Sequence, residues 1–368
     1  MTTNEGFLPK EVCEKYNLSE WQEEEIKKHS RIYYIDFKRP FFSDANRLML
    51  TKGNHIHYRY EVDKSLGKGS FSNVYKCYDH KHGKDVAIKV LRDESRFIKQ
   101  AALYEIPILE KLREINHENL IQVYKIFNHG NHICFSFPLL ENNLYDELKA
   151  NNFQGFGFIE TRKFMKQILT GLEVLRQHRI IHCDLKPENI ILTKDKSIKI
   201  IDFGSSCLCS RMSNFGFYLQ SRYYRAPEVI LGCNYNISID MWSFACIAVE
   251  IYTGCPLFPA KSTKDLLLYQ IQYMGLPPDN MLNLGRFTKK YFKIDAEWKL
   301  SSTKDYDQEI CLPNSKNLSK LLEKRRSINF VDLIESILTW DHVKRPTPKD
   351  CLKHLFFKTS NVLRSVDM

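Results

Sequence analysis

The sequence predicts an α+β fold built as two lobes: a small antiparallel β-rich lobe with one helix, then a larger, mainly α-helical lobe. From Tyr60, short segments of strand-forming residues alternate with glycine-containing turns, as in YEVDKSL, FSNVYKCYD and DVAIKVLR. After Leu140, apolar residues recur at helical spacing, as in FIETRKFMKQILTGLEVLRQH and IDMWSFACIAVEIYT. A length of 368 residues suits two domains or one large bilobal unit.

Composition points to a folded protein with a sizeable core. Hydrophobic residues make up 43% and aromatic residues 12%, which excludes a disordered polyelectrolyte and a collagen-like chain. The longest nearly apolar stretch, 241–258, is interrupted by Glu250, Gly254 and Pro256, so it falls short of a membrane span. The first residues show no basic segment leading into an apolar one. We therefore expect a soluble protein without a secretory signal and without a membrane partner.

The cysteine pattern and the net charge indicate the cellular compartment and the classes of partner to expect. The 11 cysteines are odd in number, scattered and without a CxxC pair, so we expect reduced thiols in a cytoplasmic or nuclear protein. The 54 Lys+Arg and 44 Asp+Glu residues give a formal net charge of +10. These basic residues are spread along the chain, and EKRR at 323–326 is short, so no nucleic-acid partner is expected. Phosphate on a small ligand remains a possible partner for this charge.

The chain divides into segments that differ in composition and in predicted secondary structure. Residues 1–59 are a polar accessory extension with one predicted helix, WQEEEIKKH, for which Ser19 is the N-cap. The β-rich lobe spans 60–137, and its helix is predicted over 96–113 from apolar residues three and four apart. Further strands are expected at NLIQVYKIF and HICFSF, a hinge at 138–141, the helical lobe at 142–358 and a short tail at 359–368. A cleft between two lobes is the default place for a ligand.

Two stretches of the β-rich lobe suggest phosphate binding. GKGSFSNV, residues 67–74, lies between predicted strands, where glycines let the backbone approach a phosphate. A glycine-rich hairpin is often only a turn, and Ser72 stands at the third glycine position. The phrase VAIK places Lys89 in an otherwise apolar strand, although a solvated edge lysine has the same pattern.

The helical lobe contains a more specific pattern. HCDLKPEN delivers Asp184, Lys186 and Asn189 from one loop between two apolar runs. A carboxylate, an ammonium and an amide suit hydroxyl activation, phosphate charge and metal binding, respectively. IKIIDFGSS places Asp202 at the end of a hydrophobic strand, where a second carboxylate can reach a metal, and RAPE follows.

With these motifs in this order, the chain resembles a eukaryotic protein kinase over roughly 60–358. Within that family it is similar to the CMGC group and to the DYRK kinases, through HYRYEVDKSLGKGSF, NHICFSFPLLENNLYDEL, RIIHCDLKPENI, IDFGSSC and YLQSRYYRAPEVILG. NLSEWQEEEIKKHSRIYY resembles the accessory segment of class II members, which that class is thought to use for autophosphorylation. Residues from about 276 to 328 correspond to the CMGC insert.

The resemblance implies a role for each motif residue. Lys89 would contact ATP phosphates and pair with Glu105, Asp184 would act as catalytic base and Lys186 would neutralise the γ-phosphate, while Asn189 and Asp202 would hold Mg²⁺. Asp240 would brace the catalytic loop, and Arg345 would pair with Glu228. The implied ATP-binding residues, with Phe137 as gatekeeper and 138–140 as hinge, are Leu66, Gly67, Lys68, Gly69, Ser70, Phe71, Ser72, Val74, Ala87, Lys89, Phe137, Pro138, Leu139 and Leu140.

Several positions depart from the family pattern. The hinge begins with Pro138 where the family usually has glutamate; because adenine needs only a carbonyl there, ATP binding should survive. Cys183 replaces an arginine that grips an activation-loop phosphate in many kinases. Tyr218 corresponds to the second tyrosine of a YxY motif, and Arg222 and Arg225 resemble the pair that receives its phosphate.

Pro107 lies two residues after Glu105, inside the predicted helix. Either a local kink still presents Glu105, or the helix is displaced and the Lys89–Glu105 pair is weakened. In the second case, activity should be low and Pro107→Arg should raise it.

The expected function is that of an ATP-dependent, Mg²⁺-requiring serine/threonine kinase that autophosphorylates Tyr218. Its expected partners are protein substrates with proline after the phosphoacceptor, as the CMGC resemblance implies through Arg225, and the enzyme is expected to be a monomer. The alternatives are a kinase of a neighbouring family (HIPK or YAK-like, with CLK disfavoured because EHLAMMER is absent) and a nucleotide-binding pseudokinase, disfavoured because Lys89, Asp184, Asn189 and Asp202 are all present.

Overall fold

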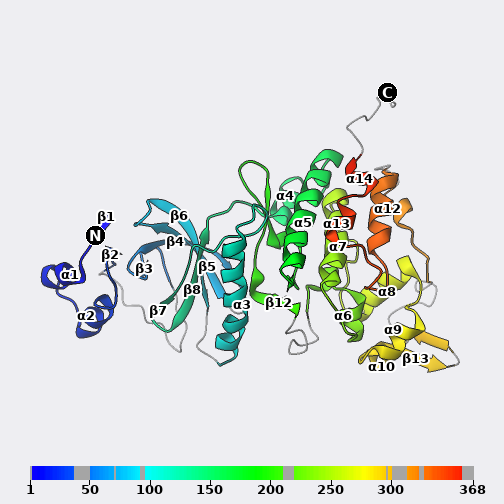
Figure 1. Ribbon diagram of the computed structural model, residues 1–368, viewed down its shortest axis with the longest axis horizontal. Helices are drawn as coiled ribbons and strands as arrows, with labels where there is room; N and C mark the ends of the chain where they lie inside the picture. The colour runs from blue at the N-terminus through cyan, green and yellow to red at the C-terminus, as the bar shows by residue number, and fades with distance from the viewer. Residues whose placement is uncertain are drawn as a thin grey trace. The chain divides into compact units, whose positions relative to one another are not determined.

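The computed structural model describes residues 2–36, 50–69, 72–91, 96–209, 219–295, 297–300, 313–322 and 327–358. The chain forms two compact units (Figure 1). The first unit comprises residues 1–116 and 121–140, and the second comprises 117–120 and 141–368. The accessory extension therefore belongs to the same unit as the β-rich segment, and the chain passes from one unit to the other after Leu140.

A six-stranded antiparallel sheet forms the framework of the first unit, as far as its described residues show, in the order β3-β4-β5-β6-β8-β7. The predicted meander is confirmed. The glycine-rich stretch was expected to end the first strand at GKGS, but β4 continues through Gly67 and Lys68, because Gly67 pairs with Val74 of the next strand. The strands are β3 (His55–Ile56), β4 (Tyr60–Lys68), β5 (Ser72–Asp79), β6 (Lys84–Leu91), β7 (Lys125–His129) and β8 (His132–Pro138).

The sheet buries one face in a core made by alternate residues of neighbouring strands. This core contains Leu50, Ile56, Tyr60, Val62, Tyr75, Cys77, Val86, Ile88, Val90, Phe127 and Cys134. Helix α3 (Arg96–Ile115) follows β6 and is unbroken at Pro107. Ile108 and Leu112, two of the apolar residues that predicted this helix, are buried.

Residues 2–36 of the accessory extension form four short elements with their own core in the first unit, whereas its segment His55–Ile56 joins the sheet as β3. They are β1 (Thr2–Phe7), α1 (Pro9–Lys15), α2 (Glu20–Ile26) and β2 (Ile32–Tyr34), with β1 and β2 paired antiparallel. The predicted cap is confirmed, since the Ser19 side chain accepts from the Gln22 N–H and forms a capping box. Val12, Ile26, Ile32 and Ile35 pack around Tyr58, which comes from the β3–β4 turn. The extension is thus built onto the edge of the sheet.

The second unit is mainly helical, as predicted, and helix α7 is its most buried long helix. Apart from its last residue, every residue of α7 is buried, as expected for a helix that is apolar all round. α5 and α12 pack against it. The longer helices are α4 (Leu144–Ala150), α5 (Phe158–Gln177), α6 (Pro227–Leu231), α7 (Ser238–Thr253), α8 (Thr263–Met274), α9 (Asp279–Leu284) and α12 (Ile328–Ile337).

Short elements complete this unit and carry its loops. The one-turn helices are α10 (Thr288–Tyr291), α11 (Leu318–Leu321), α13 (Pro348–Cys351) and α14 (Leu355–Lys358), with 3₁₀ turns at Pro187–Asn189, Phe203–Ser205 and Arg222–Tyr224. The strands pair as β9 (Ile180–Ile181) with β12 (Cys207–Leu208), β10 (Ile190–Leu192) with β11 (Ile198–Ile200) and β13 (Phe292–Asp295) with β14 (Glu297–Leu300). Among the described residues, no helix is long and apolar enough to cross a membrane.

Candidate active site

One face of the first unit's sheet carries the residues expected to surround a nucleotide. Val74 is opposite Lys89 in the β5–β6 register, and Ala87 is opposite Phe137 in the β6–β8 register. Because side chains alternate along a strand and directly opposed residues share a face, these four lie on the same side of the sheet. All four are half-buried, in contrast to the fully buried residues of the opposite face.

A buried ion pair on this face links the sheet to α3. Lys89 Nζ lies 2.7 Å from Glu105 Oε1, and the two side chains are only 13% and 6% exposed. α3 presents Glu105 to Lys89 although Pro107 lies less than one turn further along. Of the two explanations for Pro107, the structure supports the local one, and the displaced helix is wrong. The predicted Lys89–Glu105 pair is confirmed.

The glycine-rich hairpin lies at the tip of β4 and β5. Leu66, Gly67 and Lys68 are exposed at the end of β4, and the Gly69 N–H donates to the Ser72 carbonyl at 2.8 Å. A Cβ atom added at Gly67 would meet only open space, so the backbone here is accessible to a ligand. Ser70 and Phe71, also predicted to bind ATP, lie outside the described residues.

The predicted hinge follows directly from β8. Pro138 is the last residue of this strand and pairs with Val86. Leu139 and Leu140 are half-buried and belong to no strand or helix.

In the second unit, the catalytic-loop residues predicted from HCDLKPEN converge on Asp184. Lys186 Nζ donates to Asp184 Oδ2 at 2.8 Å, and Asn189 Nδ2 donates to the Asp184 carbonyl at 2.8 Å. The other carboxylate oxygen, Oδ1, accepts from the Ser221 N–H at 2.9 Å and from the Ser221 hydroxyl at 2.7 Å. The loop therefore brings the predicted carboxylate, ammonium and amide together.

Sequence reasoning missed Ser221. It lies within the quoted phrase YLQSRYYR, but nothing in that phrase indicates a contact with a loop 37 residues earlier. Its hydroxyl also accepts from Lys186 Nζ at 3.2 Å. Ser221 thus fixes the orientation of both Asp184 and Lys186.

Electrostatics keep Lys186 charged. Burial works against the charged amine, but the hydrogen bond and charge of Asp184, with the charges of Glu188 and Asp202, raise the pKa of Lys186 above its usual value. A permanently charged ammonium at this place suits a phosphate group.

Asp240 braces the backbone of the catalytic loop, as predicted. Its buried carboxylate accepts the N–H groups of His182 at 2.7 Å and Cys183 at 3.0 Å. Burial raises the pKa of Asp240 in spite of these bonds. The loop backbone needs this support because Cys183 has a positive φ of 65°.

His182 connects the loop to the strand that carries Asp202. Its Nδ1 accepts from the Asp184 N–H at 3.2 Å, so Nε2 carries the proton that is donated to the Ile201 carbonyl at 2.9 Å. Its ring packs on Phe203, with centroids 4.9 Å apart. Asp202 lies between these two contacts, is exposed and has a φ of 60°.

Asn189 and Asp202 fit the chemistry of a magnesium ligand set. Since Asn189 Nδ2 is bonded to Asp184, its Oδ1 is turned the other way, and Asp202 offers carboxylate oxygens. Mg²⁺ prefers a few such oxygens completed by water and phosphate rather than a full protein cage. Among the described residues, no group of three or more His, Cys, Asp or Glu side chains is arranged to hold a metal.

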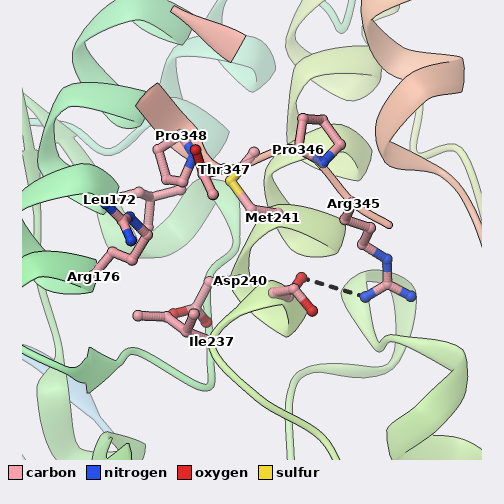
Figure 2. Close-up of a pocket in the computed structure, with 10 residues that line it drawn as sticks. Leu172, Arg176, Ile237, Asp240, Met241, Arg345, Pro346, Thr347 and Pro348 are labelled. Atoms are coloured by element: carbon pink, nitrogen blue, oxygen red, sulfur yellow. Dashed lines mark hydrogen bonds between the residues drawn. The ribbon is translucent and has the colours of Figure 1, made fainter. Parts of the chain in front are cut away.

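Arg345 and Asp240 line a small cavity next to α7 (Figure 2). The two terminal guanidinium nitrogens of Arg345, Nη1 and Nη2, reach the Glu228 carboxylate at 2.5 and 2.7 Å, which confirms the predicted pair. Arg345 Nη1 also donates to the Ser238 carbonyl at 3.3 Å. The cavity measures about 40 Å³, far below the several hundred Å³ of ligand pockets, so its lining is structural.

Two arginines near the predicted phosphotyrosine bind backbone carbonyls. Arg222 Nη1 donates to the Lys261 carbonyl at 2.7 Å, and the buried Arg225 donates to the Leu219 and Gln220 carbonyls at 2.8 Å. Tyr218 itself lies outside the described residues.

Comparison with known proteins agrees with these geometries. The family model "Protein kinase domain" matches residues 60–357. The chain is 38% identical to human dual specificity tyrosine-phosphorylation-regulated kinase 4 over 95% of this chain and 70% of that protein. It is 36% identical to the Drosophila melanogaster kinase 2 of that name over 97% of this chain and 52% of that protein, and 37% identical to the Rattus norvegicus kinase 3 over 94% and 64%.

The relatives' names favour the DYRK assignment over a neighbouring CMGC family. The chain therefore belongs to the protein kinase family and, within its CMGC group, to the DYRK kinases, which makes it a serine/threonine kinase of the dual-specificity type that uses ATP.

Proposed function

We propose that this kinase transfers phosphate through the Asp184 cluster of the second unit and the Lys89–Glu105 pair of the first. The observation that carries the proposal is the convergence of Lys186, Asn189 and Ser221 on Asp184. Lys186 Nζ and the Ser221 hydroxyl reach its carboxylate at 2.8 and 2.7 Å, and Asn189 Nδ2 reaches its backbone carbonyl at 2.8 Å. These contacts hold the carboxylate of the general base in one orientation.

Each group has a role in the transfer. Asp184 accepts the hydrogen bond of the substrate hydroxyl, whose oxygen forms the new bond to the γ-phosphorus while the bond to the β-phosphate oxygen breaks and ADP leaves. Lys186 neutralises the γ-phosphate, and Lys89, held by Glu105, contacts the other phosphates. Mg²⁺, held by Asn189 and Asp202, supplies charge stabilisation when bound. Val74, Ala87 and Phe137 form the apolar surface for adenine.

Replacing Asp184 by asparagine tests this assignment. We expect the kcat for a Ser-containing peptide to fall about 10²- to 10⁴-fold, as for the loss of one general base. Asp195→Asn is the matched control, because Asp195 lies in the β10–β11 turn and bonds only to its neighbours Thr193 and Ser197 in the contacts described. A wild-type protein that binds nucleotide but transfers no phosphate would instead support the pseudokinase alternative.

We also propose that the kinase phosphorylates its own Tyr218. The support is the position of Tyr218 four residues before Arg222 and seven before Arg225, and the names of the relatives, which describe regulation by tyrosine phosphorylation. Mass spectrometry of active enzyme should find phosphate on Tyr218, and Tyr218→Phe should lower the rate. Fully active enzyme without this phosphate contradicts the proposal.

A preference for proline after the phosphoacceptor is the third part of the proposal. Gln220 has a φ of 63°, and Arg225 Nη2 and Nε bind its carbonyl at 2.8 and 3.3 Å. A carbonyl engaged in this way cannot accept an N–H from the residue that follows the phosphoacceptor. Proline has no N–H and loses nothing there. Two peptides that differ only in Pro or Ala at this position test the preference.

Finally, we propose that the enzyme acts as a monomer in a reducing compartment of the cell, cytoplasm or nucleus. The cysteines among the described residues are all free thiols, including Cys183 and Cys207, whose sulfurs are 3.7 Å apart. Light scattering of the purified chain and imaging of a fluorescent fusion test the two statements.

A further inference from the structure

The side chain of Gln220 is the centre of a buried hydrogen-bond network in the second unit. Only 7% of the residue is exposed. Its Nε2 donates to Ser243 Oγ at 2.8 Å and to the Ile239 carbonyl at 3.0 Å, with a longer contact of 3.3 Å to the Tyr224 carbonyl. Its Oε1 accepts from the Ala226 N–H at 2.9 Å. Both ends of the amide are therefore bonded.

This network joins the segment 219–226 to the most buried helix of the unit. Ile239 and Ser243 lie on α7 and are fully buried. The Ser243 hydroxyl, which accepts from Gln220, donates in turn to the Tyr224 carbonyl at 2.8 Å. The amide thus ties the backbone of Tyr224 and Ala226 to the buried helix α7.

The backbone of Gln220 is held just as firmly, in a conformation that its residue type disfavours. Its φ of 63° is left-handed, which costs free energy for any residue with a Cβ atom. Its N–H donates to the Cys183 carbonyl at 3.0 Å, and its own carbonyl accepts from Arg225. Left-handed residues persist only where their surroundings impose the conformation, and here the two backbone bonds and the buried amide surround the residue.

We propose that the Gln220 side-chain amide is a positioning residue that selects substrates with proline after the phosphoacceptor. By anchoring Gln220 to α7, the amide keeps the backbone left-handed and the carbonyl turned toward Arg225. This inference rests on the proposed proline preference and deepens it: Arg225 binds the carbonyl from one side, and the amide fixes the conformation that offers it.

Loss of the amide should release the carbonyl. Without its anchor, a residue with a Cβ atom gains free energy by leaving the left-handed region. The carbonyl would then be able to accept an N–H from a substrate that has alanine instead of proline. Discrimination between the two substrates should fall, because alanine substrates gain a contact and proline substrates gain none.

The decisive measurement is the ratio of kcat/KM for two peptides that differ only in Pro or Ala after the phosphoacceptor. In Gln220→Met, which keeps the length of the side chain and removes its hydrogen bonds, we expect the ratio to fall about five- to tenfold, the size of one lost hydrogen bond. Gln220→Gly should keep more of the ratio than Gln220→Ala, because glycine adopts a positive φ without strain. A purely structural defect would lower both rates together and leave the ratio unchanged.

Two further variants serve as a control and as a substitute if Gln220→Met does not fold. Gln272→Met is the matched control, since Gln272 is a buried glutamine on α8, whereas the Gln220 amide bonds to Ile239 and Ser243 on α7; its ratio should equal that of the wild type. If Gln220→Met does not fold, Ser243→Ala removes one partner of the amide and should lower the ratio in the same direction by a smaller factor. A wild-type preference that survives in these variants overturns the inference alone. Equal wild-type rates on both peptides overturn the proline preference and the inference together.

Discussion

The buried pair of Glu228 and Arg345 is the clearest case in which a single residue decides stability. Both side chains are 0% exposed, and the contact is bidentate. Truncating one partner leaves the other charge buried without compensation, which typically costs about 3–5 kcal/mol. We therefore expect Arg345→Met to lower the free energy of unfolding by that amount in urea titrations followed by fluorescence.

The loss of stability in Arg345→Met should come from the Glu228 carboxylate, which stays buried and charged without its partner. Adding Glu228→Gln to Arg345→Met removes that charge and should recover a large part of the stability, because a neutral buried pair avoids most of the desolvation cost. Lys344→Met serves as the control, since Lys344 is adjacent in sequence and 80% exposed. Equal destabilisation by the Lys344 and Arg345 variants contradicts this account.

Residues with a fixed motif position could be predicted, and residues defined by backbone conformation could not. Asp184, Lys186, Asn189, Asp240 and Arg345 each occupy a motif position. The structure brings the first three together and shows the predicted contacts of Asp240 with the catalytic loop and of Arg345 with Glu228. Ser221 and Gln220 were missed because their partners come from distant segments and because nothing in the sequence marks Gln220 as left-handed. A glutamine is an unusual residue for a positive φ, so propensity argues against its observed conformation.

At the scale of an element, α3 shows how a helix accommodates proline near a functional residue. Pro107 removes one intrahelical hydrogen bond, yet the helix runs from Arg96 to Ile115 and Glu105 reaches Lys89 at 2.7 Å. Because the pair is already formed, Pro107→Arg should leave kcat within about twofold of the wild type while raising thermal stability, since a helix-breaking residue is removed. Peptide kinetics and a melting curve on the same sample check both parts. A rate increase of tenfold or more contradicts the geometry of the pair.

The β3–β4 turn is a second element that supports a prediction. Histidines of the accessory extension and of the sheet lie close together around it. The His57 ring lies 4.6 Å from the His29 ring, and the His55 and His129 rings are 6.0 Å apart. His57 Nδ1 bonds to the Asn128 carbonyl at 3.2 Å, and its Nε2 is 2.9 Å from Lys125 Nζ. A proton on Nε2 would face the Lys125 ammonium, so His57 must be neutral.

These contacts predict that the first unit loses stability in mild acid. Burial, reinforced by Lys125 and His29, lowers the pKa of His57 to about 3, and burial with His132 and His29 lowers that of His129 to about 3. The unfolded chain binds these protons near pH 6.5, so stability is fully present above that pH and falls as the pH drops toward 3. Each such histidine contributes about 1.4 kcal/mol per pH unit in this window.

Melting temperatures at pH 7.5 and pH 5.5 test this prediction. The wild type should melt lower at pH 5.5, and His57→Gln should reduce the difference, because glutamine keeps a donor and an acceptor but binds no proton. His342→Gln, in the second unit, is the control and should leave the difference unchanged. An unaltered pH response in the His57 variant shows that the cluster does not carry the effect.

At the scale of the whole molecule, local patterns predicted the elements, and tertiary contacts decided how they join. The meander and the helix over 96–113 were readable because each has one period and a clear boundary signal, and the long apolar helix was readable as an apolar run that ends at Gly254. The accessory extension was expected as a separate segment because its sequence is polar and mixed. Its core depends on Tyr58, a residue of the sheet's own turn, and such a shared core has no signature in the local sequence.

The shared core predicts that the extension is a structural part of the first unit. Tyr58 is 1% exposed, its hydroxyl donates to Glu25 at 2.6 Å, and its carbonyl accepts from the N–H groups of Tyr33 and Tyr34 at 2.8 and 3.1 Å. Tyr58 also has a φ of 50°, a strained value for a bulky residue, which these bonds maintain. Deleting residues 1–36 removes all of these contacts at once.

We expect this deletion to lower the melting temperature of the first unit by at least about 5 °C, as the loss of roughly 1 kcal/mol or more requires. Hydrogen exchange followed by mass spectrometry should show faster exchange in β3, β4 and β7, where the turn and its histidines are anchored, and unchanged exchange in α5 and α7 of the second unit. Tyr58→Phe, which removes only the bond to Glu25, should produce a smaller shift in the same strands. Unchanged protection of β3 and β4 after the deletion would mean that the sheet holds the strained turn by itself.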